Sequence, residues 1–434
     1  MGGKALLVVV VGFMIVSAYT VSTLRSSSER AGTNASLSAA KENSKRLALS
    51  GAKMTLARIN QDTSWTGNLN RSPSLSDGGS FTASMQRITG SNMSILRSIS
   101  TYPVQGTAAL HDTVDLLLQK NTRNSFSILA WMSNTEDNVT WITGDTLWGK
   151  MHTNGKLKVS GSPCFTGFVS STAGFLQLPG IGTNLGRYLA GYNPAADSIV
   201  LPTSLSELTA AASSGGKNYG STIWVNLNPN SSSDGNGVAE IRTSATGPIV
   251  ETVSLNAPFN GVIRSSGVIR VKGTLDGRLT ITSAQDIYVD DNIVYERDPR
   301  STSSNDVLGL VAEDDIIVTD NTVNRSNCTI HASIFARDGS FKAENYNSRP
   351  VSGQLQILGS IVQNIRGPVG TFQPWTTTLK SGFSKRYAYD QRLADESFRP
   401  PFYPGFISSR LTIVDIRYGN IQANTATKKN KLGL

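Results

Sequence analysis

The sequence predicts a mainly β protein. We expect a right-handed parallel β-helix, a solenoid, that is preceded by a long N-terminal transmembrane helix and a small α+β domain. Two patterns predict this class: an uncharged apolar run near the N-terminus, and short apolar strands punctuated by Gly, Asn and Asp in the second half. The 40 glycines and 16 prolines among 434 residues favour strands joined by turns over helical packing.

The apolar run covers residues 5–24 and lies between Lys4 and Arg25. About twenty helical residues span roughly 30 Å, the thickness of a bilayer core. We therefore expect residues 1–25 to be a retained membrane anchor. A cleaved signal peptide is the alternative, since Val16-Ser17-Ala18 resembles a small-residue cleavage site, and both interpretations export the rest of the chain. The predicted anchor residues are Ala5, Leu6, Leu7, Val8, Val9, Phe13, Ile15 and Val16.

Residues 26–62 are predicted to continue the same helix as a stem, because no proline interrupts the chain before Asn70. Small and apolar residues recur along the stem at alternating steps of three and four, which predicts a helix-packing seam. The seam could pack on the protein's own globular part or on another helix in an assembly, and spacing does not distinguish the two. Its members are Leu37, Ala40, Ser44, Leu47, Gly51 and Met54.

Residues 63–142 predict a small α+β domain. The segments 80–88, 93–100 and 107–118 have the alternation of antiparallel strands. A long hydrophobic helix followed by such strands resembles minor-pilin-like proteins of pilus assembly, in which the helix anchors the subunit and the sheet packs on its exposed half. The resemblance implies pilin-like or secretion-system subunits as partners through the N-terminal helix. Unlike most pilins, the apolar run contains no acidic residue.

Residues 143–372 predict the parallel β-helix. Similar short segments begin at Ala284, Ala312 and Ala336, and this recurrence suits successive coils of a solenoid. An antiparallel sandwich is the rival fold, but hairpin dipeptides at regular spacing are scarce. Residues 373–434 predict a C-terminal cap and a basic tail. The expected core column comprises Ile281, Ile287, Val289, Leu310, Ile316, Val318, Ile334, Phe335, Phe341, Leu355, Ile357 and Ile361.

Three motifs resemble an uncharacterised bacterial surface family: the Gly-Asp…His-Thr-Asn-Gly text of 144–155, the run of 277–295, and the Tyr-Asp-x-Arg-Leu…Pro-Pro-Phe-Tyr-Pro ending. Members of that family combine a pilin-like anchor with a β-helical domain of unknown function. The resemblance therefore implies a fold and a cell-surface location, and it supplies no activity or catalytic residue.

The charge distribution argues against nucleic acid as a partner. The net charge is +9, but residues 1–60 carry +6 and Lys428, Lys429 and Lys431 carry the rest, so residues 61–427 are neutral. A basic stem suits anionic membrane lipid or a partner helix. Three dispersed histidines and two cysteines predict no metal and no cofactor. Cys164 and Cys328 could pair or remain free thiols.

These patterns predict a membrane-anchored, extracytoplasmic structural protein without catalysis, acting in a pilus-like or secretion assembly or in adhesion. The alternative is a β-helix that binds or cleaves surface polysaccharide. It is based on Asp286, Asp314 and Asp338, which could form a ladder on stacked coils and hold carbohydrate or calcium. Cleavage needs two carboxylates ~5 to 9.5 Å apart across a groove. Aspartate in such positions more often ends a turn.

Overall fold

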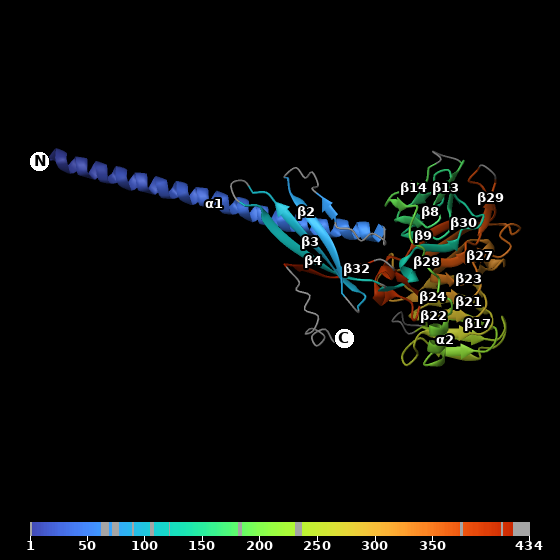
Figure 1. Ribbon diagram of the computed structural model, residues 1–434. Helices are drawn as coiled ribbons and strands as arrows, with labels where there is room; N and C mark the ends of the chain where they lie inside the picture. Colours follow the sequence, from blue (N-terminus) through green and yellow to red (C-terminus); the bar gives the residue numbers. More distant parts are fainter. Residues whose placement is uncertain are drawn as a thin grey trace. The chain divides into compact units, whose positions relative to one another are not determined.

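The computed structural model divides the chain into two compact units, which are described separately (Figure 1). The first combines Met1–Thr122 with Ile407–Leu434, and the second is Arg123–Phe406. The domain boundaries predicted from the sequence are different. They place residues 123–142 in the small domain and residues 407–419 in a C-terminal cap. The described residues are 2–61, 69–71, 78–88, 91–104, 108–120, 122–180, 185–230, 237–373, 376–408 and 411–419. The basic tail therefore lies outside them.

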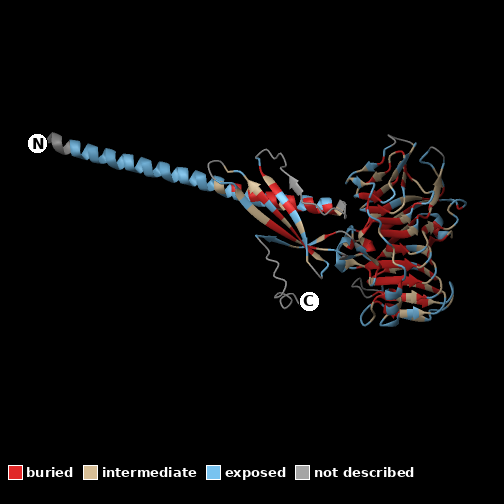
Figure 2. Cartoon of the chain, in the orientation of Figure 1, coloured by how far each residue is buried: buried red, intermediate tan, exposed pale blue. Residues whose placement is uncertain are grey.

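The first unit begins with a single 60-residue helix, α1 (Gly2–Gln61). At ~1.5 Å per residue it is about 90 Å long. Exposed ion pairs one turn apart join Arg25 to Glu29 and Arg46 to Glu42, and each adds a few tenths of a kcal/mol, on the order of 0.3, to helix stability. Figure 2 shows that the first part of α1 is exposed, whereas burial begins near Ala40 and continues to Ile59.

A five-stranded antiparallel sheet covers the second half of α1. Its spatial order is β1-β2-β3-β4-β32. Alternate residues face the helix, so the sheet has one apolar face, as the period of two requires. The strands are β1 (Leu69–Arg71), β2 (Ser80–Arg87), β3 (Met93–Tyr102), β4 (Leu110–Gln119) and β32 (Thr412–Tyr418). Their shared core with α1 contains Ala48, Ala52, Leu56, Ile59, Leu96, Val114, Leu116, Leu118 and Leu411.

The strand β32 is the main difference from the expected C-terminal cap. It comes from the far end of the described chain and pairs with β4, from Thr412 opposite Gln119 to Tyr418 opposite Val114. The end of α1 fixes the start of this strand, because the Asn60 amide donates to the Leu411 carbonyl (3.0 Å) and accepts from the Leu411 N–H (2.8 Å). Both bonds satisfy backbone groups that a short edge segment would otherwise leave unpaired.

Gly51 sets the distance between α1 and the sheet. A Cβ atom at this position would lie 2.5 Å from the Phe81 ring and 2.6 Å from Ser98 Oγ. We expect Gly51→Leu to destabilise the first unit by about 3 kcal/mol, because the side chain would force the helix off the sheet. Amide hydrogen exchange of β2 and β3 measures the effect. Gly32→Leu is the control, since a Cβ there meets no described atom within 4 Å, and equal protection in both variants would contradict the prediction.

The second unit is built from ladders of parallel strands. The first ladder stacks in-register apolar side chains, including Ile281 on Leu310 and Ile334 on Ile361. Such columns, rich in β-branched side chains, fit a pleated, buried surface. In spatial order its strands are β16 (Lys217–Tyr219), β20 (Val262–Ser265), β22 (Arg278–Ser283), β24 (Val307–Ala312), β26 (Cys328–Ala336), β28 (Val351–Ile365), β6 (Trp131–Thr135), β9 (Met151–Thr153), β12 (Val169–Ser171) and β15 (Tyr192–Asn193).

The described residues of this unit form three further parallel ladders. The second contains β17 (Ile223–Asn228), β21 (Ile269–Leu275), β23 (Ile287–Tyr295), β25 (Ile316–Val318) and β27 (Phe341–Ala343). The third joins parts of β23, β26 and β28 to β30 (Leu379–Tyr389), β8 (Thr146–Trp148), β11 (Cys164–Phe165) and β14 (Arg187–Tyr188). The fourth contains β7 (Trp141–Ile142), β10 (Leu157–Ser160) and β13 (Phe175–Leu178).

The remaining elements are short. Antiparallel additions to the ladders are β18 (Val238–Arg242), β19 (Glu251–Ser254) and β29 (Gly370–Phe372), and the strands near the unit boundary are β5 (Thr122–Ser125) and β31 (Gly405–Ser408). The helices are α2 (Ser206–Ser213), η1 (Phe126–Ile128), η2 (Val323–Arg325), η3 (Gln391–Ala394) and η4 (Glu396–Phe398).

The chain enters the first ladder in its middle. It starts at β6, proceeds to β15 at one end, crosses over through residues 194–216, and returns from β16 at the other end to β28. There β28 pairs with β6, Ile361 opposite Trp131, so that strands far apart in the sequence become neighbours. The two stretches of the unit therefore meet at a junction between β28–β30 and β6–β8, which we call the closure junction.

The crossover covers one outer face of the ladder. Leu205 and the α2 residues Leu208, Ala211 and Ala212 pack with outward side chains of the strands beneath. Phe335 is one of these outward side chains, although the sequence pattern predicts it in the inner column. The reason is its position next to the inward Ile334, because neighbouring residues in a strand face opposite sides. The other eleven residues of the expected column lie in the main core.

Candidate functional site

The exposed apolar part of α1 is the first candidate site. Its side chains from Leu7 to Leu24 project into solvent, and Phe13 and Val8 are 76% and 70% exposed. The helix is long and apolar enough to cross a membrane, with a mean hydropathy of 2.2 in its most apolar window. Of the predicted anchor residues, Leu7, Val8, Val9, Phe13, Ile15 and Val16 are exposed, and the side chains of Ala5 and Leu6 lie outside the described residues. An exposed apolar surface of this length needs a covering, because burying it is favourable.

The predicted seam on the stem faces the chain's own sheet over most of its length. Ala40, Ser44, Leu47 and Gly51 are buried, and Ser44 Oγ lies 2.9 Å from Ser100 Oγ of β3. Leu37 is half-buried and Met54 is 42% exposed, so the seam turns away from the sheet at its C-terminal end. The buried stripe continues instead through residues that the pattern omitted: Ala48, Ala52, Thr55, Leu56 and Ile59.

The aspartates proposed as a ladder lie one residue out of register. The pairing of Ile287 with Ile316 places Asp286 opposite Asp315, whereas the recurrence of similar segments at Ala284 and Ala312 placed it opposite Asp314. Asp286 Oδ1 accepts the Asp315 N–H at 2.9 Å, and Asp315 Oδ1 accepts the Ser340 N–H at 2.7 Å. The Asp315 carboxylate also pairs with Lys342 of β27. These carboxylates therefore bind the backbone of the next strand.

The other two members of that set are exposed. Asp314 faces solvent, and Asp338 pairs with its neighbour Arg337 at 2.6 Å. The pKa of Asp286 is raised, chiefly by burial and further by the nearby carboxylates of Asp315 and Asp314. Among the described residues, no group of three or more His, Cys, Asp or Glu side chains is arranged to hold a metal ion.

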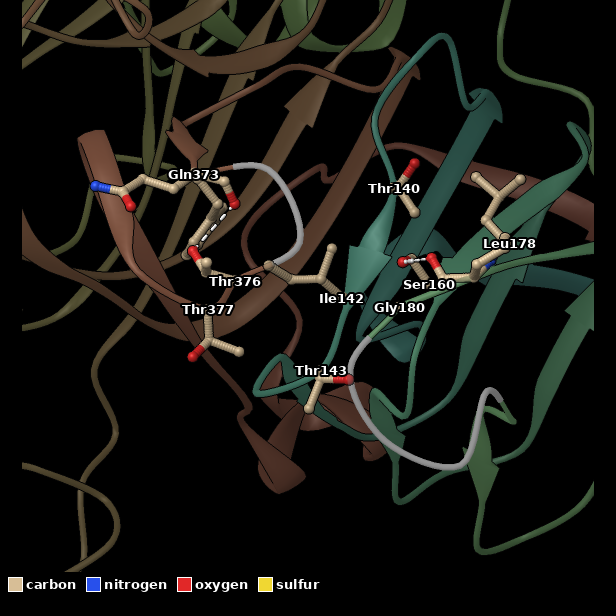
Figure 3. A pocket seen from close by; sticks show the side chains of 11 residues that line it. Thr140, Ile142, Thr143, Ser160, Leu178, Gly180, Gln373, Thr376 and Thr377 are labelled. Atoms are coloured by element: carbon tan, nitrogen blue, oxygen red, sulfur yellow. Dashed lines mark hydrogen bonds between the residues drawn. The ribbon is translucent and has the colours of Figure 1, made fainter.

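A cavity of about 500 Å³ opens between β7 and the turn after β29 (Figure 3). Threonines from both sides and Ile142 line it, and Ser160 Oγ donates to the Pro179 carbonyl at 2.6 Å on its wall. The described lining residues carry hydroxyl, amide and apolar groups and no charge. They are Thr140, Ile142, Thr143, Ser160, Leu178, Pro179, Gly180, Phe372, Gln373, Thr376 and Thr377.

Two ion pairs inside the second unit were missed by sequence reasoning. Arg366 and Glu136 are 1% and 2% exposed, with Nη1 and Oε2 2.7 Å apart. The guanidinium also lies over the Trp141 ring, 4.4 Å from its centroid. Lys385 Nζ lies 2.7 Å from Asp145 Oδ2, and these side chains are 10% and 5% exposed. Both pairs span the closure junction. The alternation Phe383, Lys385, Tyr387 was the available signal, since it places a lysine among inward residues.

His331 is a buried histidine that the structure holds neutral. Its Nδ1 accepts the Tyr295 backbone N–H at 3.2 Å, which requires an unprotonated nitrogen. The pKa of His331 is lowered to about 4, chiefly by burial and in part by Arg300 and Arg392, against the opposing effects of Asp298 and Asp390.

Stability of the second unit is therefore expected to fall as the pH drops. Unfolding frees a histidine with an ordinary pKa of about 6.5, so the contribution of His331 to stability is complete above this value and declines as the pH falls toward 4. The expected loss is about 3 kcal/mol. Urea unfolding followed by tryptophan fluorescence at a series of pH values measures it. In His331→Gln the free energy of unfolding should depend less on pH over this range, whereas His111→Gln, at an exposed position, should leave the dependence unchanged. An unchanged pH dependence in His331→Gln would show that His331 is not responsible for the loss.

The two cysteines are free thiols. Cys328 is buried in the second unit, which raises the pKa of its thiol to about 12, and Cys164 is half-buried. The structure forms no disulfide between them.

Comparisons with known proteins give structural similarity but no family. No family model and no curated protein matches the chain. Among solved structures, the chain is similar to the crystal structure of the competence-associated pilin ComZ from Thermus thermophilus. The identity is 12% over 87% of this chain and 96% of that chain, with a TM-score of 0.35.

Proposed function

We propose that this protein is a membrane-anchored, extracytoplasmic structural subunit of a pilus-like or secretion assembly, or a surface adhesin. One observation carries the proposal: a single continuous helix is exposed and apolar from Leu7 to Leu24 and buried against its own sheet from Ala40 onward. The exposed half can enter a bilayer, or pack on neighbouring subunits, while the buried half holds the sheet of the first unit.

The second unit is, in this proposal, a parallel β-helix that the anchor tethers to the membrane. Four parallel ladders of the described residues, with in-register apolar columns, support this fold, and the strands inside each ladder have a neighbour on both sides. A body stabilised in this way suits a mechanical or adhesive role. The carboxylates of Asp286 and Asp315 bind backbone N–H groups, which supports a structural role for them over glycan cleavage.

Membrane fractionation tests the anchoring role. The full-length protein is expected to remain in membranes washed with high salt and carbonate, whereas Val9→Lys combined with Phe13→Lys should release it, because charges at the centre of a span cost about 2.5 to 3.5 kcal/mol each. Ser26→Lys combined with Ser28→Lys is the matched control on the exposed polar part of α1. Retention of the first double variant would exclude the anchor.

Assembly is tested separately on the same membranes. Gentle detergent extraction followed by sedimentation is expected to recover the protein with higher-order filaments or complexes. A protein that is membrane-bound yet solely monomeric would exclude the assembly role and leave the adhesin.

A further inference from the structure

Lys385 occupies an interior position of the second unit. In β30, the residues on either side of it in the alternation, Phe383 and Tyr387, belong to the main core. Tyr387 pairs with Leu147 of β8, so the register places Lys385 directly opposite Asp145, two residues earlier in both segments. The lysine therefore stands where the neighbouring strand β28 has the apolar Leu355. A lysine in an apolar column is costly unless it has a specific partner.

The two side chains meet end to end in a dry environment. Nζ of Lys385 lies 2.7 Å from Oδ2 of Asp145, and the same oxygen accepts the Ile142 backbone N–H at 3.1 Å. The ammonium position lies over the ring of Trp141, 5.2 Å from its centroid. Trp141 in turn contacts the ring of Trp131. A backbone N–H group thus fixes the Asp145 carboxylate, and an aromatic ring fixes the Lys385 ammonium.

We propose that Lys385 and Asp145 condense into an intramolecular amide bond that covalently closes the second unit. The ammonium first passes a proton to the carboxylate, which leaves a neutral amine beside a neutral carboxylic acid. The amine nitrogen then attacks the carboxyl carbon, a C–N bond forms, and a C–O bond breaks. One carboxyl oxygen departs as water with two hydrogens of the former ammonium. The step is neutral overall and needs no oxidant, reductant or activated co-reactant.

The surroundings favour this step in three ways. Burial lowers the pKa of Lys385, against the raising effects of Asp145 and Glu136, and the nearby Arg366 lowers it further, so that the nucleophilic amine is more accessible than in water. Fixing reacting groups in contact gives effective molarities of about 10⁵ to 10⁸ M. Exclusion of water from the site opposes hydrolysis of the product.

The neighbouring Arg366–Glu136 pair shows why the lysine is the reactive partner. It is at least as well buried, and its charged atoms are also 2.7 Å apart. A guanidinium remains protonated in proteins, however, and offers no free nucleophilic nitrogen. Arg366 and Glu136 are therefore expected to stay ionic and to position the site electrostatically.

The bond would lie at the closure junction, where it has the greatest structural effect. It links two residues that are distant in the sequence and ties β30 to the segment before β8. The strands β28–β30 would thus be covalently linked to the strands β6–β8, and a pulling force could not separate them without breaking a covalent bond. This inference does not depend on the anchoring role.

Mass spectrometry of the purified full-length protein tests the proposal. Trypsin should yield one cross-linked species that contains residues 124–150 and 381–386, because an acylated Lys385 is not cleaved, and its mass should equal the two peptides less one water. Fragmentation should place the link between Asp145 and Lys385. Recovery of both segments unlinked from the folded wild-type protein would overturn the proposal.

Lys385→Arg is the matched variant, because it keeps the positive charge beside Asp145 and cannot form the amide. Its intact mass under denaturing conditions should differ from that of the wild type by the substitution plus one water. A difference equal to the substitution alone would also overturn the proposal. If this variant does not fold, the wild-type peptide map decides the question by itself.

Discussion

Replacing Gly359 by alanine is expected to prevent stable folding of the second unit, with a loss on the order of 4 kcal/mol or more. Gly359 lies in the middle of β28, opposite Ala332 of β26. A Cβ atom there would lie 1.9 Å from the Ala332 carbonyl oxygen, and the φ angle of +155° is one that side chains rarely adopt. The clash is with backbone, so no side-chain rotation relieves it, and the ladder would have to separate.

The measurement is the yield of folded protein, followed by urea unfolding monitored by tryptophan fluorescence. Gly220→Ala is the matched control in the same unit, since a Cβ at Gly220 meets no described atom within 4 Å. The control should change the free energy of unfolding by less than about 0.5 kcal/mol. Equal stability of the two alanine variants would mean that the strands are not stacked as described.

Removing the carboxylate of Glu136 is expected to destabilise the second unit by about 3 to 5 kcal/mol, because it leaves Arg366 buried and uncompensated. The guanidinium is held by a single carboxylate contact at 2.7 Å, by the Val139 carbonyl at 3.4 Å, and by the rings of Trp131 and Trp141. The aromatic faces offset only part of the desolvation of a positive charge. Ser133 Oγ also donates to Glu136, and this bond would be lost as well.

A double variant separates the charge effect from lost packing. Combining Glu136→Leu with Arg366→Leu removes both charges and should recover most of the stability, because a buried ion pair can be replaced by apolar groups at little cost. Glu207→Ala is the exposed control, since Glu207 pairs with Arg123 on the surface, and it should cost less than about 1 kcal/mol. Similar losses for Glu136→Ala and Glu207→Ala would contradict the burial of the first pair.

The long helix and the β character of the rest follow from local sequence signals. Hydropathy and the absence of proline set the extent of α1, and alternation identified the strands around 80–118. Registers were less predictable. The recurrence of similar segments placed Ala284 opposite Ala312, whereas the structure pairs Ser283 with Ala312. A register error of one residue assigns every side chain to the wrong face of the strand. For this reason the sequence pattern predicted Asp314 in the aspartate ladder, where the structure has Asp315.

Long-range features left no local signal. The strand around Ile413 to Tyr418 alternates like any edge strand, and only its pairing with β4 reveals that it belongs to the first unit. The closure junction brings together strands from distant parts of the sequence, and no residue pattern in either segment indicates that the two strands pair. The interior charge at Arg366 was missed for the same reason, because a charge is recognised as buried only when its partner is known. For Lys385 the alternation with Phe383 and Tyr387 gave a local signal, but nothing local identified Asp145 as its partner.

The most direct test of the central claim is to determine on which side of the membrane the second unit lies. A single cysteine at Val200, which is 74% exposed, is introduced into a Cys164→Ser background, where Cys328 remains buried. Spheroplasts of an expressing bacterium are then treated with a membrane-impermeant maleimide. The proposal predicts that the cysteine is labelled in intact spheroplasts to the same extent as in lysed ones. Labelling that appears only once the cells are lysed would place this unit in the cytoplasm and contradict the proposed function.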